Sequence, residues 1–127
     1  ENVPELLDEL SCRKFKLTVL SNKPHEFTLI AVNKLLPSWD FKMILGQREG
    51  IPRKPDPEGM LEICEKLKIP SSSFIYLGDT ATDMQTSSAA GCFSVGVLWG
   101  FRNEQELRDN GAKAIVKDPL DVLDLLL

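Results

Sequence analysis

Two carboxylates close together mark the point where a buried strand of this sequence is expected to end. Asp79 follows the apolar run 74–77, and Asp83 comes four residues later as the chain turns into a helix. Gly78 between them and the strand permits a sharp turn. Open α/β sheets bind ligands at the carboxyl ends of their strands, and oxygen ligands there suit a hard cation such as Mg²⁺. The alternative is that Asp79 or Asp83 only caps the helix, as Asp often does.

Two further polar side chains lie where the chain leaves predicted strands. Ser21 follows the strand 15–20, and its hydroxyl, with the backbone N–H groups at the start of a helix, suits a phosphate. Lys54 lies in a loop stiffened by Pro52 and Pro55, so that its ammonium group would neutralise a phosphoryl group at a fixed position. Each has a simpler explanation, because turns favour Ser and loop lysines are usually solvated. Together they are more specific than either is alone.

The elements that position these residues alternate between helix and strand. Strands are expected over 15–20, 43–46, 74–77, 93–98 and 114–116. Helices are expected over 1–10 and 25–36, from 57 to 67, up to a stop at Gly91, from 103 to 111, and from 118 onward. This alternation predicts a three-layer, doubly wound α/β domain with a mainly parallel sheet.

Apolar spacing and caps predict how several of the helices pack. Asp56 is expected to cap the helix that begins at Pro57, and Asn103 the helix that Gly111 ends. In the helix 25–36, one side carries Phe27, Ile30, Ala31 and Leu35. The positions expected to point inward are Met60, Leu61, Cys64 and Leu67 in the helix 57–67, and Leu120, Leu123 and Leu127 in the closing helix.

Length and composition indicate one globular domain over residues 1–127. The chain is 43% hydrophobic and 27% charged, and its net charge of −4 without a basic stripe argues against a nucleic-acid partner. No apolar run approaches the ~20 residues of a membrane span, and no signal peptide opens the chain. Cys12, Cys64 and Cys92 have neither a zinc spacing nor a disulfide pattern, which predicts reduced thiols in a cytoplasmic protein.

In their order and spacing, these motifs resemble the second, third and fourth motifs of the haloacid dehalogenase (HAD) superfamily of phosphohydrolases. The matching stretches are the turn at 21–24, the Lys-Pro-Asp-Pro loop at 54–57, and the strand end at 78–80 with Asp83. The first two stretches and the Gly-Val-Leu-Trp-Gly segment at 96–100 also resemble the phosphoglycolate phosphatase branch. The resemblance covers about residues 3–116 and implies a Rossmann-like, HAD-type fold.

The resemblance implies a magnesium-dependent phosphatase that acts on a small phosphorylated metabolite through an aspartyl-phosphate. By motif position, Ser21 with Asn22 would bind the phosphoryl oxygens, and Lys54 would stabilise both the phosphoryl group and the charge of the nucleophile. Asp79 would ligate Mg²⁺, directly or through water, and Asp83 would support the metal site. Ser21 and Lys54 are thus the expected catalytic residues, and positioning and electrostatics supply most of the catalysis.

One departure from the family pattern is as informative as the matches. The family's nucleophile follows an apolar strand that ends in Asp-Xaa-Asp, and this chain has no such motif: Asp8 lies in a helical pattern, and Asp40 follows a turn. In the family fold that strand is central, between the strands ending at Ser21 and Asp79, and its loss would leave backbone groups unpaired. We therefore expect Glu1 not to be the natural start, and these residues to be the carboxyl-terminal half of a larger enzyme, inactive alone and without its cap.

Two alternative functions stay open from the sequence, and a third is disfavoured. The chain would be a non-catalytic module that binds phosphate or magnesium, or part of a phosphatase for another small substrate, such as a nucleoside monophosphate. A signalling receiver domain is disfavoured, because it needs an Asp that ends an early strand. Arg102 lies near the strand ends, where it would touch a substrate carboxylate or serve only as an exposed structural arginine. The sequence predicts no oligomeric state.

Overall fold

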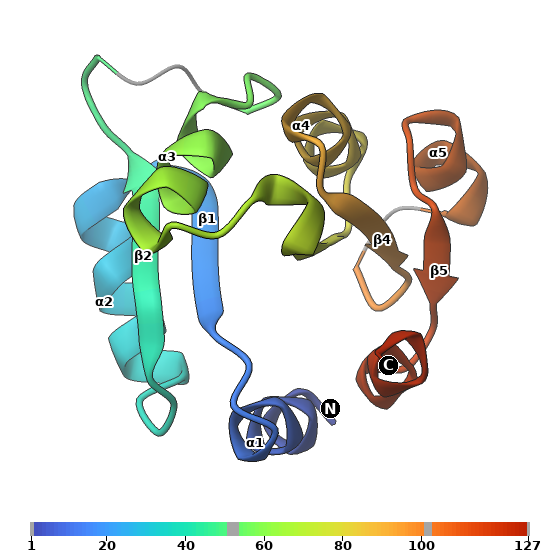
Figure 1. Ribbon diagram of the computed structural model, residues 1–127, viewed down its shortest axis with the longest axis horizontal. Helices are drawn as coiled ribbons and strands as arrows, with labels where there is room; N and C mark the ends of the chain where they lie inside the picture. Colours follow the sequence, from blue (N-terminus) through green and yellow to red (C-terminus); the bar gives the residue numbers. More distant parts are fainter. Residues whose placement is uncertain (1, 51–53, 101–102, 127) are drawn as a thin grey trace.

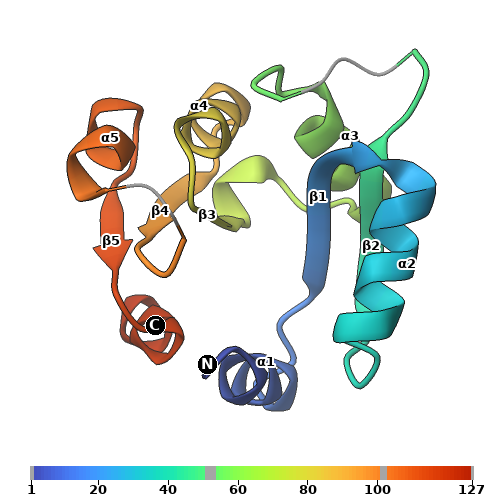
Figure 2. The ribbon, with the colours of Figure 1, turned by 180° about the vertical axis from the view of Figure 1, so that it is seen from behind.

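Within the described residues, five strands form two separate parallel sheets. The computed structural model describes residues 2–50, 54–100 and 103–126. In the first sheet β1 (Leu17–Pro24) pairs with β2 (Phe41–Gln47), and in the second β3 (Ile75–Gly78), β4 (Phe93–Val97) and β5 (Ala114–Val116) pair in that order. Figures 1 and 2 show the sheets side by side, with β1 and β3 as the facing strands. The predicted α/β class with parallel strands is confirmed, but the sheet is split between β1 and β3.

The helices alternate with the strands as expected, with differences at their ends. They are α1 (Val3–Cys12), α2 (His25–Leu35), α3 (Glu58–Leu67), α4 (Ala81–Ala90) and α5 (Glu104–Asp109), with the 3₁₀ helices η1 (Ser71–Ser73) and η2 (Pro119–Leu125). Gly91 ends α4 in the left-handed region at φ 88°, and Asn103 caps α5 by accepting the Glu106 N–H at 2.9 Å. Pro57, not Asp56, is the residue that precedes α3, although the Asp56 carboxylate does accept the Glu58 N–H at 2.9 Å.

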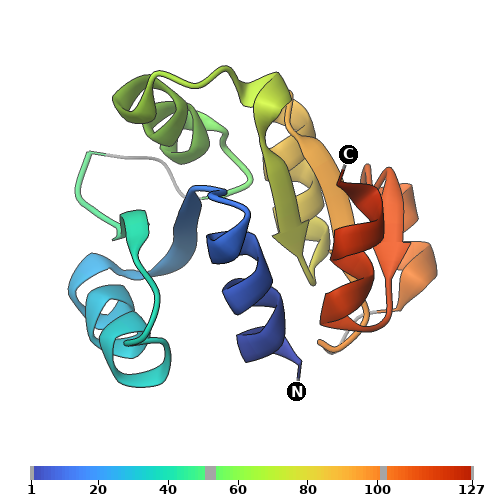
Figure 3. The same ribbon diagram turned by 60° about the horizontal axis from the view of Figure 1, so that its bottom comes forward.

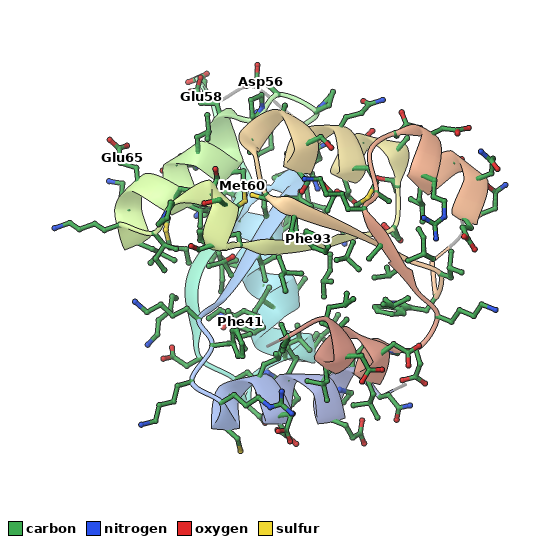
Figure 4. All side chains as sticks on the ribbon, turned by 45° about the vertical axis from the view of Figure 1, so that its right-hand side comes forward. Phe41, Asp56, Glu58, Met60, Glu65 and Phe93 are labelled. Atoms are coloured by element: carbon green, nitrogen blue, oxygen red, sulfur yellow. The ribbon has the colours of Figure 1, made fainter. Side chains whose placement is uncertain are left out.

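Two apolar clusters lie on opposite faces of the second sheet. One joins α3 to β2, β3 and the end of α4 through Leu45, Met60, Ile63, Tyr76, Ala90 and Cys92. The other joins α1 and η2 to β4 and β5 through Leu6, Val95, Val97, Val116 and Val122. Since side chains alternate along a strand, Tyr76 and its partner Ser94 face one layer while Val95 faces the other. Figure 4 shows Met60 directed into the protein and Glu65, on the opposite side of α3, directed outward.

Two of the predicted inward positions are wrong. Leu61 is 45% exposed, and Ile63 takes the buried position, because Met60, Ile63 and Leu67 follow one helical face and Leu61 lies about 100° around the helix from Met60. Leu120 is 36% exposed because η2 has three residues per turn, a period that aligns Val122 with Pro119 instead. Leu127 lies outside the described residues.

The apolar side predicted for α2 faces solvent. Phe27, Ile30 and Leu35 are 62%, 60% and 71% exposed, while Thr28 and Val32 are buried against the first sheet. Hydrophobicity alone therefore pointed to the wrong face of this helix. The buried face includes a hydroxyl because Thr28 Oγ1 hydrogen-bonds the carbonyls of Lys23 and Pro24, at 3.3 and 3.2 Å.

Besides the apolar cluster around Met60, two contacts at opposite ends of the molecule hold the sheets together. At one end α1 packs on η2, and Asn2 Nδ2 donates to Asp118 Oδ2 at 2.9 Å; Figure 3 shows these two helices near one another. At the other end Lys54 bonds to β1 of the first sheet and to Asp83 of α4, the helix that follows β3, as described below. Within the described residues no helix has the length and apolar character that a membrane crossing needs.

Candidate active site

The carboxyl end of β1 is a tightly hydrogen-bonded turn. Ser21 Oγ accepts the N–H of Lys23 at 3.0 Å, which orients the hydroxyl within the turn. The imidazole Nδ1 of His25 accepts the N–H of Gly46 at 3.0 Å, so the start of α2 is tied to the end of β2. A Cβ at Gly46 would lie 2.5 Å from the His25 Cα, so only glycine permits this approach. These contacts fix the backbone on which Ser21 and Asn22 stand.

Lys54 is positioned by groups from two elements, β1 and α4. Its backbone N–H donates to Asn22 Oδ1 at 3.0 Å, and its peptide bond to Pro55 is cis. Its ammonium group reaches Asp83 Oδ1 at 2.7 Å and the Leu20 carbonyl oxygen at 3.4 Å. The side chains of Lys54 and Asp83 are each only 13% exposed, so this ion pair is largely removed from solvent. Pro52, which the sequence suggested as a stiffening residue, lies outside the described residues.

Asp83 uses both carboxylate oxygens to join the two strand ends. Oδ1 accepts from Lys54, and Oδ2 accepts the backbone N–H of Asp79 at 3.2 Å. The cap of α4 is Thr80, whose Oγ1 accepts the Asp83 N–H at 3.1 Å. The alternative that Asp79 or Asp83 is present only to cap this helix is therefore wrong.

Two glycines make room for the aspartates. A Cβ at Gly78 would lie 2.3 Å from the Asp83 Cβ, and a Cβ at Gly100 would lie 2.3 Å from Asp79 Oδ2. Gly78 ends β3 and is not among the described glycines with positive φ, so close approach and not a sharp turn explains it. Gly100 appears in the sequence analysis only as the last residue of the segment 96–100, and its contact with Asp79 was not predicted.

The carboxylate of Asp79 has no partner among the described residues and is therefore available to a cation. Asp83 is committed to Lys54 and a backbone amide, whereas the Asp79 side chain has no hydrogen bond or ion pair to any described residue. Among the described residues no three His, Cys, Asp or Glu side chains gather closely enough to enclose a metal ion. A single carboxylate is a hard, anionic oxygen ligand of the kind that Mg²⁺ prefers. A metal ion bound to it would take its other oxygen ligands from water or substrate.

Burial keeps the nearby thiol and phenol protonated. Burial, and to a smaller extent the neighbouring Cys64, raises the pKa of Cys92 to about 11. The Cys92 thiol is therefore a poor nucleophile at neutral pH. The pKa of Tyr76 is raised mainly by burial and, to a smaller extent, by electrostatic repulsion from Asp83 and Cys92. All three cysteines are free. The carboxylates and Lys54, and not the thiol or the phenol, are therefore the described groups that carry charge beside β3.

A cleft of about 680 Å³ opens between the two sheets beside these groups. Lys54, Asp79 and Asp83 line one end of it, next to Trp99. A cavity of about 10 Å³, the size of a single water, lies behind Ser21, Asn22 and Lys54. The structure thus brings four of the five predicted residues into one chain of contacts, from Asn22 through Lys54 and Asp83 to Asp79. Ser21 lies beside them without a bond to them, and Arg102 lies outside the described residues.

Residues 1–97 match the family model of haloacid dehalogenase-like hydrolases, and the chain belongs to this family. The chain is 28% identical over 124 residues to the phosphoglycolate phosphatase of Pectobacterium atrosepticum, and 26% identical over 125 residues to that of Escherichia coli K12.

Solved structures show the same fold. A Lactobacillus delbrueckii subsp. bulgaricus protein, provisionally assigned as a phosphoglycolate phosphatase, superposes with a TM-score of 0.91 at 33% identity. The two chains match over 99% of this chain and 52% of that one. A Haemophilus somnus protein described as a predicted phosphoglycolate phosphatase has a TM-score of 0.89 at 25% identity, over 99% of this chain and 56% of that one.

The match covers only part of each relative. It includes 98% of this chain in both curated comparisons, but 53% of the Pectobacterium protein and 50% of the E. coli protein. The chain therefore spans about half the length of the curated relatives it matches.

Proposed function

We propose that this chain supplies the phosphate-binding and metal-binding half of a phosphatase that hydrolyses a small phosphate monoester. The observation that carries the proposal is the contact chain from Asn22 through Lys54 and Asp83 to Asp79, which joins two strand ends at one mouth of the cleft. A cation and a free carboxylate held this close together suit a group with several negative oxygens. Membership of a hydrolase family and the phosphatase relatives support the same reaction class.

Each residue has a role that follows from its position. Lys54 neutralises charge on the transferred phosphoryl group, and Asn22 and Asp83 fix its backbone and its ammonium group. Ser21 with Asn22 presents hydrogen-bonding groups to the phosphoryl oxygens, beside the amino end of α2. Asp79 would hold Mg²⁺ with support from Asp83, and the bound ion would supply positive charge that offsets the charge on the phosphate.

The attacking carboxylate comes from outside this chain. Asp8 Oδ1 accepts from the indole of Trp39, and Asp40 Oδ2 accepts from Lys42, so both are engaged away from Lys54. In the reaction, an oxygen of the external carboxylate bonds to phosphorus as the ester P–O bond breaks, and the leaving alkoxide takes a proton from water to become the alcohol. Water then hydrolyses the aspartyl-phosphate and releases inorganic phosphate.

Phosphoglycolate is the substrate we infer from the relatives, with other small phosphate esters and nucleoside monophosphates as alternatives. The curated relatives named above are phosphoglycolate phosphatases at 26–28% identity, which supports a small phosphorylated metabolite. The three free cysteines support a cytoplasmic location. A second candidate function, a module that binds phosphate or Mg²⁺ without turnover, is favoured by the engagement of Asp8 and Asp40 elsewhere.

The proposal is tested by binding and turnover of inorganic phosphate and phosphoglycolate with Mg²⁺. The 127-residue chain should bind inorganic phosphate in a titration calorimeter, and Lys54→Met should abolish that binding. Lys42→Met is the matched control, because Lys42 pairs with Asp40 at 2.8 Å on the surface. Phosphate binding unaffected by Lys54→Met would refute the assignment, and turnover by the chain alone would refute an external nucleophile. Binding without turnover by a longer natural protein that includes this chain would establish the non-catalytic module.

A further inference from the structure

The outward-facing side of α2 carries an apolar patch that the described residues leave exposed. Phe27, Ile30 and Leu35 are 62%, 60% and 71% exposed, although side chains of these types are usually buried. Figures 1 and 2 both show α2 at the outer margin of the molecule, on the side away from the second sheet. Large apolar side chains gathered on one exposed face are typical of a surface that binds another protein.

Helical spacing arranges this side of α2 in two adjacent rows, each with members four residues apart. The first row is apolar, with its smallest member in the middle: Phe27, Ala31 and Leu35. The second row has an acid at its amino end, an apolar residue in the middle and a base at its carboxyl end: Glu26, Ile30 and Lys34. The two charged side chains are exposed and make no hydrogen bond or ion pair to any described residue. Both are therefore available to a partner.

The apolar row is complementary to itself about a two-fold axis. When two copies of a helix pack antiparallel, the amino end of each lies against the carboxyl end of the other. With Ala31 at the axis, its methyl group permits a close approach of the two helices at their crossing point. Phe27 of one copy then packs on Leu35 of the second copy, and the same contact occurs again by symmetry. Both exposed ends of this row are covered in such a dimer.

The charged row is complementary to itself in the same arrangement. Antiparallel packing brings the same flank of both helices together, so this row faces its own copy running in the opposite direction. Glu26 of one copy therefore lies opposite Lys34 of the second copy, twice by symmetry, and the two Ile30 side chains meet between these pairs. An occupant of this face must present apolar side chains with a base at one end and an acid at the other. A second α2 meets both requirements.

We infer that the outward-facing side of α2 is a dimer interface between two copies of this chain, packed antiparallel about a two-fold axis at Ala31. The helix has 11 residues and is roughly 16 Å long, so the contact is smaller than the ~800 Å² per partner of standard interfaces. The association is accordingly weak and reversible, with an expected dissociation constant of about 0.01–1 mM. The inference rests on α2 alone and needs no phosphatase activity.

Sedimentation equilibrium of the 127-residue chain tests this interface, in buffer without phosphate or Mg²⁺. The chain should follow a monomer–dimer equilibrium, and Glu26→Lys should weaken it at least about tenfold, because two lysines then face each other. Adding Lys34→Glu to Glu26→Lys exchanges the two charges and should restore the dissociation constant to within about threefold. The matched control is Glu65→Lys, which makes the same charge change at an exposed position of α3 and should not alter the dissociation constant.

NMR spectra recorded on dilution identify the surface that associates. The amide signals of Phe27, Ile30 and Leu35 should shift with protein concentration, and shifts at Leu77 instead would assign association to the cleft and overturn the inference. A chain that stays monomeric at about 1 mM, or a dimer that Glu26→Lys leaves intact, would also overturn it. A longer natural protein that includes this chain should dimerise in the same way, and a monomer whose additional residues cover α2 would refute the inference. A failure to bind phosphate would leave all these results unaffected.

Discussion

Replacing Asp83 by Asn should destabilise the protein far more than a comparable change on the surface. The Lys54–Asp83 pair is 2.7 Å long with both side chains 13% exposed, and Asn leaves the ammonium group without its counter-charge. Removing one partner of a buried pair costs about 3–5 kcal/mol, and exposed pairs contribute about 0–1 kcal/mol. For this mostly buried pair we expect a loss of about 2–4 kcal/mol, a large part of the ~5–15 kcal/mol typical of a domain.

Urea unfolding followed by tryptophan fluorescence measures the effect. The matched control is Asp40→Asn, because Asp40 and Lys42 form a pair of similar length, 2.8 Å, with side chains 80% and 47% exposed. The control should change the free energy of unfolding by less than about 1 kcal/mol. Asp83→Asn should lower the urea midpoint by about 1 M or more, given slopes of about 1–3 kcal/mol per molar.

A double variant distinguishes lost charge pairing from general damage. Lys54→Met combined with Asp83→Asn removes the uncompensated ammonium group, so the double variant should lose less stability than the two single changes added together. If Asp83→Asn cost no more than Asp40→Asn, or if the single changes were additive, the ion pair would not hold the two sheets together as we argue.

Two further predictions concern Asp79 and the thiols. Gly100→Ala should weaken Mg²⁺ binding at least about tenfold in calorimetry, because the new methyl group would lie 2.3 Å from Asp79 Oδ2, and unchanged affinity would show that Asp79 is not the ligand. The free energy of unfolding should fall as pH rises from 9 to about 11, because Cys92 keeps its proton in the folded state while the unfolded thiol, with its ordinary pKa of 9.0, loses it. Cys92→Ala should flatten that fall, and an unchanged slope would contradict the assignment.

Local sequence patterns predicted most helices and strands, because the formation and the ends of these elements depend on residues that are neighbours in the sequence. Apolar runs gave four of the strands to within a few residues, and Gly91, Asn103 and Asp118 mark helix ends through their own backbone or side-chain geometry. The errors are of another kind. The period of η2 and the orientation of α2 are decided by packing against distant strands, so Leu120 and Phe27 lie in solvent although their spacing suggested a buried face.

The order of the motifs predicted which residues form the candidate site. It did not predict the hydrogen bonds and the ion pair that join these residues. Ser21, Lys54 and Asp79 were chosen because each follows a strand or lies in a constrained loop. The bond from Lys54 to Asp83 joins residues 29 positions apart, and nothing in either local sequence specifies it. The same holds for Gly100, whose importance depends on the approach of another loop to Asp79.

The packing of α1 has a consequence for how the protein unfolds. By sequence α1 belongs with β1 and β2, yet its Leu6 side chain packs with Val95, Val97 and Val122 of the second sheet. The segment from α3 to η1 connects β2 of the first sheet to β3 of the second. Its Met60 packs with Leu45 and Tyr76, one from each sheet. Each half of the chain thus supplies side chains to the core of the other half. Separation of the two sheets would therefore disrupt both cores, and we expect the two sheets to unfold together.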